Sequence, residues 1–330
     1  MFKSKKLILL LFLCLVMVMV VAGCGGNKEA QQSKGGGEAS GGETSADWPT
    51  KDITLVYHSA AGSGGDMFLR ALAKAVEGPL GVSVIVDNKP GAAGMNAWKA
   101  VDEAKDGHTF LGVSSTIVTS PIMNEMPLNY QSFEPLAMLF VDPMIFFVNV
   151  DAPWNTWEDF VEDAKANPGK FNIAGGVPGE LGFVAAKLLQ EQAGIEFNVV
   201  PFEGGADAAV SVLGGHVDGA IGEYGEAVNQ IEGGKLKALI AFNPIEGVDI
   251  PTVQDKGMDI EIEKFRGVLA PKGTPEEVID IWVDALRAAL EDPEFKQYYQ
   301  NLKLVVNFKE KDEFTEVMAD QDAQIRQFMQ

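Results

Sequence analysis

The stretch AAGSGGD at residues 60–66 has the residue types and spacing of an anion-binding loop. An apolar run at 53–57 precedes it and a helix-patterned run follows it, which is typical of a strand, a glycine-rich loop and a helix. Backbone N–H groups at such a helix start can hold a phosphate or a carboxylate. The loop lacks the Gly-Lys-Ser/Thr ending of a Walker loop, and Met67 stands where a dinucleotide fingerprint starting at Gly62 needs a third glycine. We therefore expect a small anion such as a carboxylate, and no nucleotide.

Catalytic and metal-binding patterns are missing from the sequence. The three histidines, His58, His108 and His216, are far apart and never in metal-ligand spacing, and the stretch 112–116 lacks the final glycine of a G-x-S-x-G nucleophile elbow. His216 follows two glycines that predict the end of a helix, so a role in the turn is a simpler interpretation than ligand binding. We expect no enzyme, no metal site and no cofactor.

Strand and helix patterns alternate almost without a break from residue 53 onward. Strands are predicted at 53–57, 82–86, 109–113, 171–174, 197–201, 218–221 and 236–242, and helices at 92–104, 156–166, 182–193, 206–213 and 224–232. A further helix should begin with Thr274 as its N-cap and Pro275 in its first turn. Short apolar strands between helices favour parallel sheets covered on both faces. The apolar stretch 136–150, interrupted at Asp142-Pro143, predicts a crossover between two α/β units.

The N-terminus has the layout of a secretory signal. Three lysines precede an unbroken apolar run at 7–22, which is shorter than the ~18 residues of a spanning helix. Cys24 follows Ala22-Gly23 as in a bacterial lipobox, so residues 1–23 are predicted to be a lipoprotein signal peptide and Cys24 the lipidation site. A diacyl chain and a third acyl group such as palmitate would give stable anchoring; an uncleaved membrane anchor is the alternative. Residues 24–47 are predicted to be a flexible tether, because 25–46 contain no large apolar side chain.

Composition narrows the compartment and the partners. The chain has 26 basic and 47 acidic residues, a net charge of −21, which argues against nucleic acid and against an anionic membrane surface as partners. Its two cysteines, Cys14 and Cys24, both lie in the N-terminal segment, so the folded part has no disulfide. We expect an extracytoplasmic monomer that touches the cell membrane only through its lipid anchor.

Five stretches resemble the substrate-binding proteins of tripartite tricarboxylate transporters, the TctC or Bug family. They are residues 53–73, 86–111, 200–223, 234–242 and 266–290, and they occur in family order within about 48–305. The resemblance implies an α/β, type II periplasmic-binding-protein fold with two lobes and a ligand cleft between them. Lobe 1 would be 48–148 plus 267–330 and lobe 2 149–266. Such a protein captures a small organic carboxylate and delivers it to membrane permease subunits.

The resemblance also implies a set of ligand-binding residues. Carried over position by position, the set lies in the first loop, at the end of the third strand and in second-lobe loops. It comprises Ser59, Ala61, Gly62, Ser63, Gly64, Asp66, Ser114, Ser115, Gly175, Gly179, Glu180, Phe183, Glu203 and Glu223. Asp66 can instead cap the helix, the two serines after the third strand can be strand-end or helix-cap residues, and the glutamates can point to solvent.

Departures from the family pattern bear on the ligand. Glu180 and Phe183 stand where serine and histidine are usual, residues 58–60 replace the usual Pro-Phe-Pro, and the carried-over loops contain no arginine or lysine. Unpaired carboxylates repel a bound polyanion. The expected ligand is thus a monocarboxylate, an amino-acid-like zwitterion or an acid with an amine end, and not citrate. Two other classes stay open: a receptor subunit that signals to a partner, and a secreted enzyme on the same scaffold.

Overall fold

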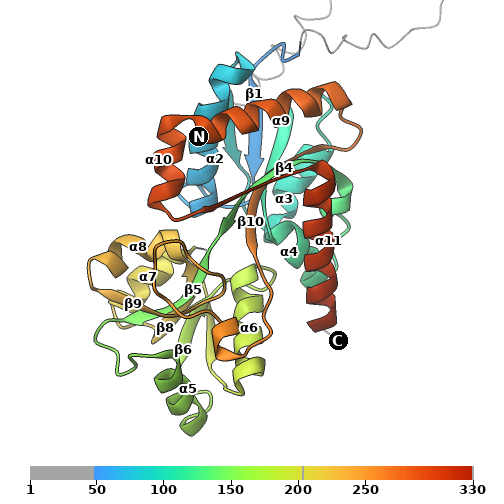
Figure 1. Cartoon of the computed structure of the whole chain (residues 1–330). Coiled ribbons are helices and arrows are strands. Elements are labelled where there is room, and N and C mark those ends of the chain that lie inside the picture. Colours follow the sequence, from blue (N-terminus) through green and yellow to red (C-terminus); the bar gives the residue numbers. More distant parts are fainter. Residues whose placement is uncertain (1–47, 203, 329–330) are drawn as a thin grey trace, which may run out of the picture. The chain divides into compact units, whose positions relative to one another are not determined.

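Residues 48–202 and 204–328 are described by the computed structural model, and their strands form two mixed sheets (Figure 1). The first sheet has the order β11-β4-β10-β3-β1-β2, with bounds β1 Ile53–Tyr57, β2 Val84–Asn88, β3 Thr109–Ser114, β4 Phe133–Asp142, β10 Lys264–Pro271 and β11 Val305–Glu310. The second has the order β7-β6-β8-β5-β9, with bounds β5 Met144–Asn149, β6 Asn172–Gly175, β7 Asn198–Pro201, β8 Gly219–Glu223 and β9 Leu236–Ala241.

Helices connect and cover these strands. Those of the first half are α2 Gly64–Leu80, α3 Met95–Asp102, α4 Thr116–Asn124, α5 Trp157–Ala166 and α6 Leu181–Ala193. Those of the second half are α7 Gly205–Leu213, α8 Tyr224–Glu232, α9 Glu276–Glu291, α10 Pro293–Asn301 and α11 Lys311–Phe328. Short 3₁₀ turns occupy Ala92–Gly94, Tyr130–Ser132 and Gln254–Lys256.

Helix ends follow local capping chemistry. The N-cap of α5 is Thr156, whose hydroxyl accepts from the N–H of Asp159, while the Asp159 carboxylate accepts from the Thr156 N–H. The expectation that Thr274 caps α9 is wrong. Its hydroxyl donates to the Pro271 carbonyl, 2.7 Å away, and Pro275 is the residue before the helix.

Strands β1, β4 and β5 are largely apolar because both of their faces are buried. In β1, Ile53, Leu55 and Tyr57 pack into the cluster around Trp282 of α9, whereas Val56 packs on the opposite face with Trp98 of α3. The alternate residues of β5 divide in the same way between two clusters of the second sheet. Two-sided burial therefore explains the continuous apolar runs in the sequence.

The chain passes from the first sheet to the second between β4 and β5. Asp142 ends β4 and Met144 starts β5 in the other sheet, with only Pro143 between them. The chain returns between β9 and β10. The expected crossover within 136–150 is thus present, but the lobe boundaries given above stay a prediction.

The expectation of parallel sheets is only partly correct. Strand β1 pairs in parallel with β2 and β3, and β6 pairs in parallel with β7 and β8. Strands β10 and β11 of the first sheet, and β5 of the second, pair antiparallel with their neighbours. Local patterns could not reveal this, because pairing direction depends on which distant strands meet.

The signal peptide, the tether and Cys24 lie outside the described residues. Within 48–202 and 204–328, none of the helices combines the length and apolar character that crossing a membrane requires.

Candidate functional site

A small polar chamber, which we call the inner chamber, lies between residues of the two sheets and has a volume of about 60 Å³. Tyr57, Ser63 and Gly64 line it from the first sheet side, and Gly175, Gly205 and Glu223 from the second. An adjoining outer chamber of about 350 Å³ shares His58, Ser59, Thr116 and Glu180 with it. The inner chamber is small compared with pockets for drug-sized ligands, ~300–1,000 Å³, and suits a ligand of a few heavy atoms.

The loop at 60–66 is fixed by its own polar groups. Ser63 is the N-cap of α2, and its hydroxyl accepts from the Asp66 N–H at 3.3 Å. Oδ2 of Asp66 accepts from the Gly62 N–H at 2.8 Å and from Nε of Arg70 at 3.0 Å. Burial opposes ionisation of Asp66, but these hydrogen bonds lower its pKa below the ordinary value. Asp66 is therefore a buried loop-fixing residue and not the N-cap itself.

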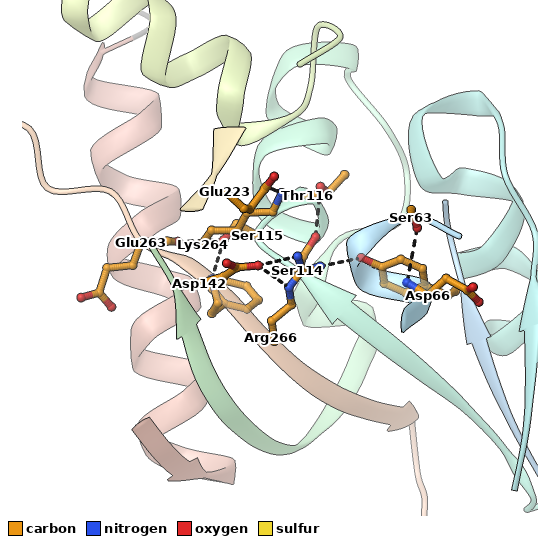
Figure 2. Close-up of polar contacts among 12 residues, drawn as sticks. Ser63, Asp66, Ser114, Ser115, Thr116, Asp142, Glu223, Glu263, Lys264 and Arg266 are labelled. Carbon is orange, nitrogen blue, oxygen red and sulfur yellow. Dashed lines mark hydrogen bonds and ion pairs between the residues drawn. The ribbon is translucent and has the colours of Figure 1, made fainter. Parts of the chain in front are cut away.

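Two basic side chains reach the inner chamber from β10. Arg266 Nε and Nη2 donate to Asp142 Oδ2 at 3.0 and 2.5 Å, and its Nη1 donates to the Tyr57 hydroxyl at 3.1 Å (Figure 2). Lys264 lies two residues before Arg266 on the same strand, and it forms an ion pair with Glu223 at the end of β8. Burial alone would lower the pKa of Arg266, but the Asp142 carboxylate raises it, so the guanidinium stays charged.

The pKa of Lys264 is lowered. Burial and then the positive charge of Arg266 bring it to about 8, against the opposing charges of Asp142 and Glu180. Glu223 is therefore not the unpaired carboxylate that the sequence suggested, and each β10 cation already has a carboxylate partner within the protein.

His58 lines both chambers and is buried, with 9% of its side chain exposed. Its Nδ1 has no hydrogen-bond partner among the described residues. Burial, Lys264 and Arg266, in that order, lower the pKa of His58 to about 3. The ring is therefore neutral at physiological pH, with one nitrogen able to donate and the other able to accept.

Glu226 lies in the first turn of α8, and its carboxylate lies between the starts of two other helices. A Cβ added to Gly64, the first residue of α2, would collide with its Oε1; one added to Gly205, the first residue of α7, would collide with its Oε2. Burial, and then the negative charge of Asp142, raise the pKa of Glu226, while Arg266 and the backbone N–H groups of Gly205 and Gly64 lower it less strongly. The carboxylate therefore lies so close to both helix starts that it would have to shift if either glycine carried a side chain.

The structure brings half of the predicted ligand residues to the inner chamber. These are Ser59, Ser63, Gly64, Ser114, Gly175, Glu180 and Glu223; Gly179 lines the outer chamber, together with Ser59 and Glu180. Ala61, Gly62, Asp66, Ser115 and Phe183 line neither, and Glu203 lies outside the described residues. Whether these residues bind ligand stays a proposal.

Ser115 and Ser114 illustrate the alternatives that the sequence left open. The fully buried hydroxyl of Ser115 donates to the Glu263 carbonyl at 2.8 Å and accepts from the Phe265 N–H at 3.0 Å, so it joins α4 to β10. The hydroxyl of Ser114 donates to Thr116 at 3.2 Å at the chamber wall (Figure 2).

Sequence reasoning missed several polar residues of the inner chamber: Tyr57, His58, Thr116, Glu226, Lys264 and Arg266. One signal was available for the two cations. Lys264 and Arg266 alternate with Phe265 and Gly267 at the start of a buried apolar strand, and charges at a spacing of two point to one face of that strand.

Two sheets covered by helices, with a small polar chamber between them, are the arrangement expected for an extracytoplasmic solute-binding protein. The family model described as "Tripartite tricarboxylate transporter family receptor" matches residues 68–330. The chain therefore belongs to the tripartite tricarboxylate transporter receptor (TctC) family, as the sequence resemblance predicted. This is a family of solute-binding receptors and not of enzymes.

Individual relatives agree with this assignment. The UPF0065 protein in the gbd 5' region of Cupriavidus necator is 29% identical over 280 residues, covering 79% of this chain and 84% of the relative. A ligand-free TctC solute-binding protein from Polaromonas is 32% identical, with a TM-score of 0.69 over 84% of this chain and 96% of its own.

Two Rhodopseudomonas palustris structures, one with adipate and one with malate, are 22% identical to the chain. Their TM-scores are 0.79 and 0.74; they cover 85% and 84% of this chain, and 97% and 98% of their own. At this identity they show the shared fold.

Proposed function

We propose that the protein captures a small organic acid with one carboxylate, or an acid that also carries an amine, in the inner and outer chambers. The observation that carries this proposal is the polar chamber between the two sheets, lined by the hydroxyls of Ser59 and Thr116 and by a neutral His58 whose Nδ1 has no hydrogen-bond partner among the described residues. Such neutral donors suit a single carboxylate. The adipate and malate held by relatives of the same fold support a carboxylate as the ligand class.

Charge within the chamber favours an acid of low charge. Lys264 and Arg266 are already matched by Glu223 and Asp142. A tricarboxylate would bring three negative groups to a place where the protein's own cations are already paired, and desolvation would make this costly.

The proposed role in the cell is delivery of the bound acid to the permease subunits of a tripartite transporter. The ligand contacts both sheets and so favours the closed arrangement, which the permease would recognise. We propose that Cys24 holds the monomeric protein on the outer face of the cell membrane through its lipid. The wild type should then incorporate labelled palmitate and a Cys24→Ser variant should not, and equal labelling of both proteins would contradict the anchor.

A thermal-melt screen of the purified protein tests the ligand class. Monocarboxylates, dicarboxylates, tricarboxylates and amino acids are each added at a large excess. A ligand at a hundred times its dissociation constant adds ~2.7 kcal/mol, which corresponds to roughly 5–10 °C at ~2–4 °C per kcal/mol. A shift with a monocarboxylate or an amino acid supports the proposal, and no shift with any acid refutes it.

A pair of matched variants locates the site. Thr116 lines both chambers, so Thr116→Val should reduce the shift given by the active ligand. Thr315 is exposed on α11 and its hydroxyl bonds only locally, to the Lys311 carbonyl, so Thr315→Val should keep the full shift. Equal shifts in both variants would place the ligand elsewhere.

A further inference from the structure

The carboxylate of Glu226 occupies the junction of two helix starts, where a ligand carboxylate could otherwise lie. Its two oxygens lie against Gly64 and Gly205, the first residues of α2 and α7. Helix α2 follows β1 of the first sheet, and α7 follows β7 of the second. Backbone N–H groups and helix dipoles at such starts favour a negative charge. A ligand that bridges the two sheets would put a carboxylate at this junction, but the protein's own carboxylate already lies there.

Among the described residues that line the inner chamber, the positive charges are already paired. Lys264 is paired with Glu223 and Arg266 with Asp142, and both cations lie in the chamber wall. Burial and the charge of Asp142 already disfavour ionisation of Glu226. A further anionic group beside these carboxylates would therefore be repelled.

A second observation points to the groups that would receive the ligand's carboxylate. His58 is nine-tenths buried, lines the chamber, and has an Nδ1 atom without a partner among the described residues. Like His58, Ser59 and Thr116 line both the inner and the outer chamber. These groups can receive one carboxylate without competing with Glu226.

We propose that Glu226 stands in for a second ligand carboxylate, and that it makes the site select a monocarboxylate over the dicarboxylate of the same chain length. This inference rests on the proposed function, because it concerns the selectivity of the same site. Glu226 is then a specificity-determining residue supplied by the protein. The site needs only one carboxylate from the ligand, because the Glu226 carboxylate already lies against the first residues of α2 and α7.

The test compares acids of equal length on the full-length protein. Butyrate is paired with succinate and hexanoate with adipate, and their dissociation constants are measured by calorimetry for the wild type, Glu226→Ala and Glu232→Ala. Glu232 lies at the exposed end of the same helix and serves as the matched control. Glu226→Ala should shift the ratio of affinities toward the dicarboxylate by about tenfold to a hundredfold, the range expected for a charge-assisted hydrogen-bonded group.

The possible outcomes are distinct. The inference is overturned if the wild type prefers dicarboxylates. It is also overturned if Glu226→Ala has the same ratio of monocarboxylate to dicarboxylate affinity as the wild type. If Glu226→Ala does not fold, Glu226→Gln keeps the shape and removes the charge, and it should shift the ratio in the same direction. If neither the wild type nor the variants bind any carboxylate, the proposed function itself fails and the inference fails with it.

Discussion

Acid should destabilise the protein through His58, and the structure sets the size of the effect. The buried ring beside Lys264 and Arg266 has a pKa of about 3 when the protein is folded, against about 6.5 when it is unfolded. Between these values the unfolded state binds one more proton than the folded state. The free energy of unfolding therefore falls as the pH drops below 6.5, and the loss is complete near pH 3.

The magnitude follows from the difference between the two pKa values. Each pH unit within the window is worth ~1.36 kcal/mol, so lowering the pH from 7.5 to 5 should cost the wild type ~2 kcal/mol through His58 alone. For a folded unit of this size, that corresponds to roughly 4–8 °C in Tm. The side chain is only 9% exposed, so solvent screening removes little of this value.

The assay compares variants at the two pH values. Urea unfolding is measured at pH 7.5 and pH 5 for the wild type, His58→Gln and the control His216→Gln, whose side chain lies exposed at the turn after α7. His58→Gln should lose ~2 kcal/mol less than the wild type between the two pH values, and His216→Gln should lose as much as the wild type. Equal losses in all three proteins would refute the burial argument.

Three other substitutions test the framework of the site, each by its urea midpoint and Tm. Asp142→Asn leaves the buried Arg266 guanidinium without its carboxylate and should cost ~3–5 kcal/mol; an unchanged midpoint would mean that the guanidinium finds another partner. Gly65→Ala places a Cβ against the Tyr57 hydroxyl and ring and should cost ~1–3 kcal/mol, whereas neutrality would show that Tyr57 can move. Ile325→Ala empties a fully buried position in the second-sheet cluster and should cost ~2–5 kcal/mol; a loss below ~1 kcal/mol would mean that α11 is not held there.

Local sequence patterns predicted the elements well because burial and helix period act over a few residues. The strand at 53–57 and the helix at 224–232 were predicted with the bounds that the structure has. The helix predicted at 92–104 is shorter, Met95–Asp102, because residues 92–94 form a 3₁₀ turn with positive φ at Ala92 and Ala93. Hydrophobic period alone does not reveal such a backbone conformation.

The site was predicted less completely because it is assembled by tertiary pairing. The hydrogen bond from Arg266 to Tyr57 joins residues 209 apart, and it forms because β10 inserts between β3 and β4. The loops that surround the chambers could be identified from the family resemblance. The strand-borne cations and Glu226 required knowledge of which strands and helix starts meet, which no local pattern contains.

The pairing of Asp142 with Lys264 has a mechanical consequence. These two residues lie opposite each other in β4 and β10. Asp142 is the last residue before the chain leaves the first sheet, and Lys264 is the first residue after it returns. Both connections therefore lie on one line, which can act as the axis of a bend between the sheets. Charged groups on that axis move only a short distance when the sheets bend, whereas groups far from the axis move more. Opening would then part the rim of the cleft while the ion pairs at its base stay nearly stationary, so a solute could enter without the cost of separating buried charges.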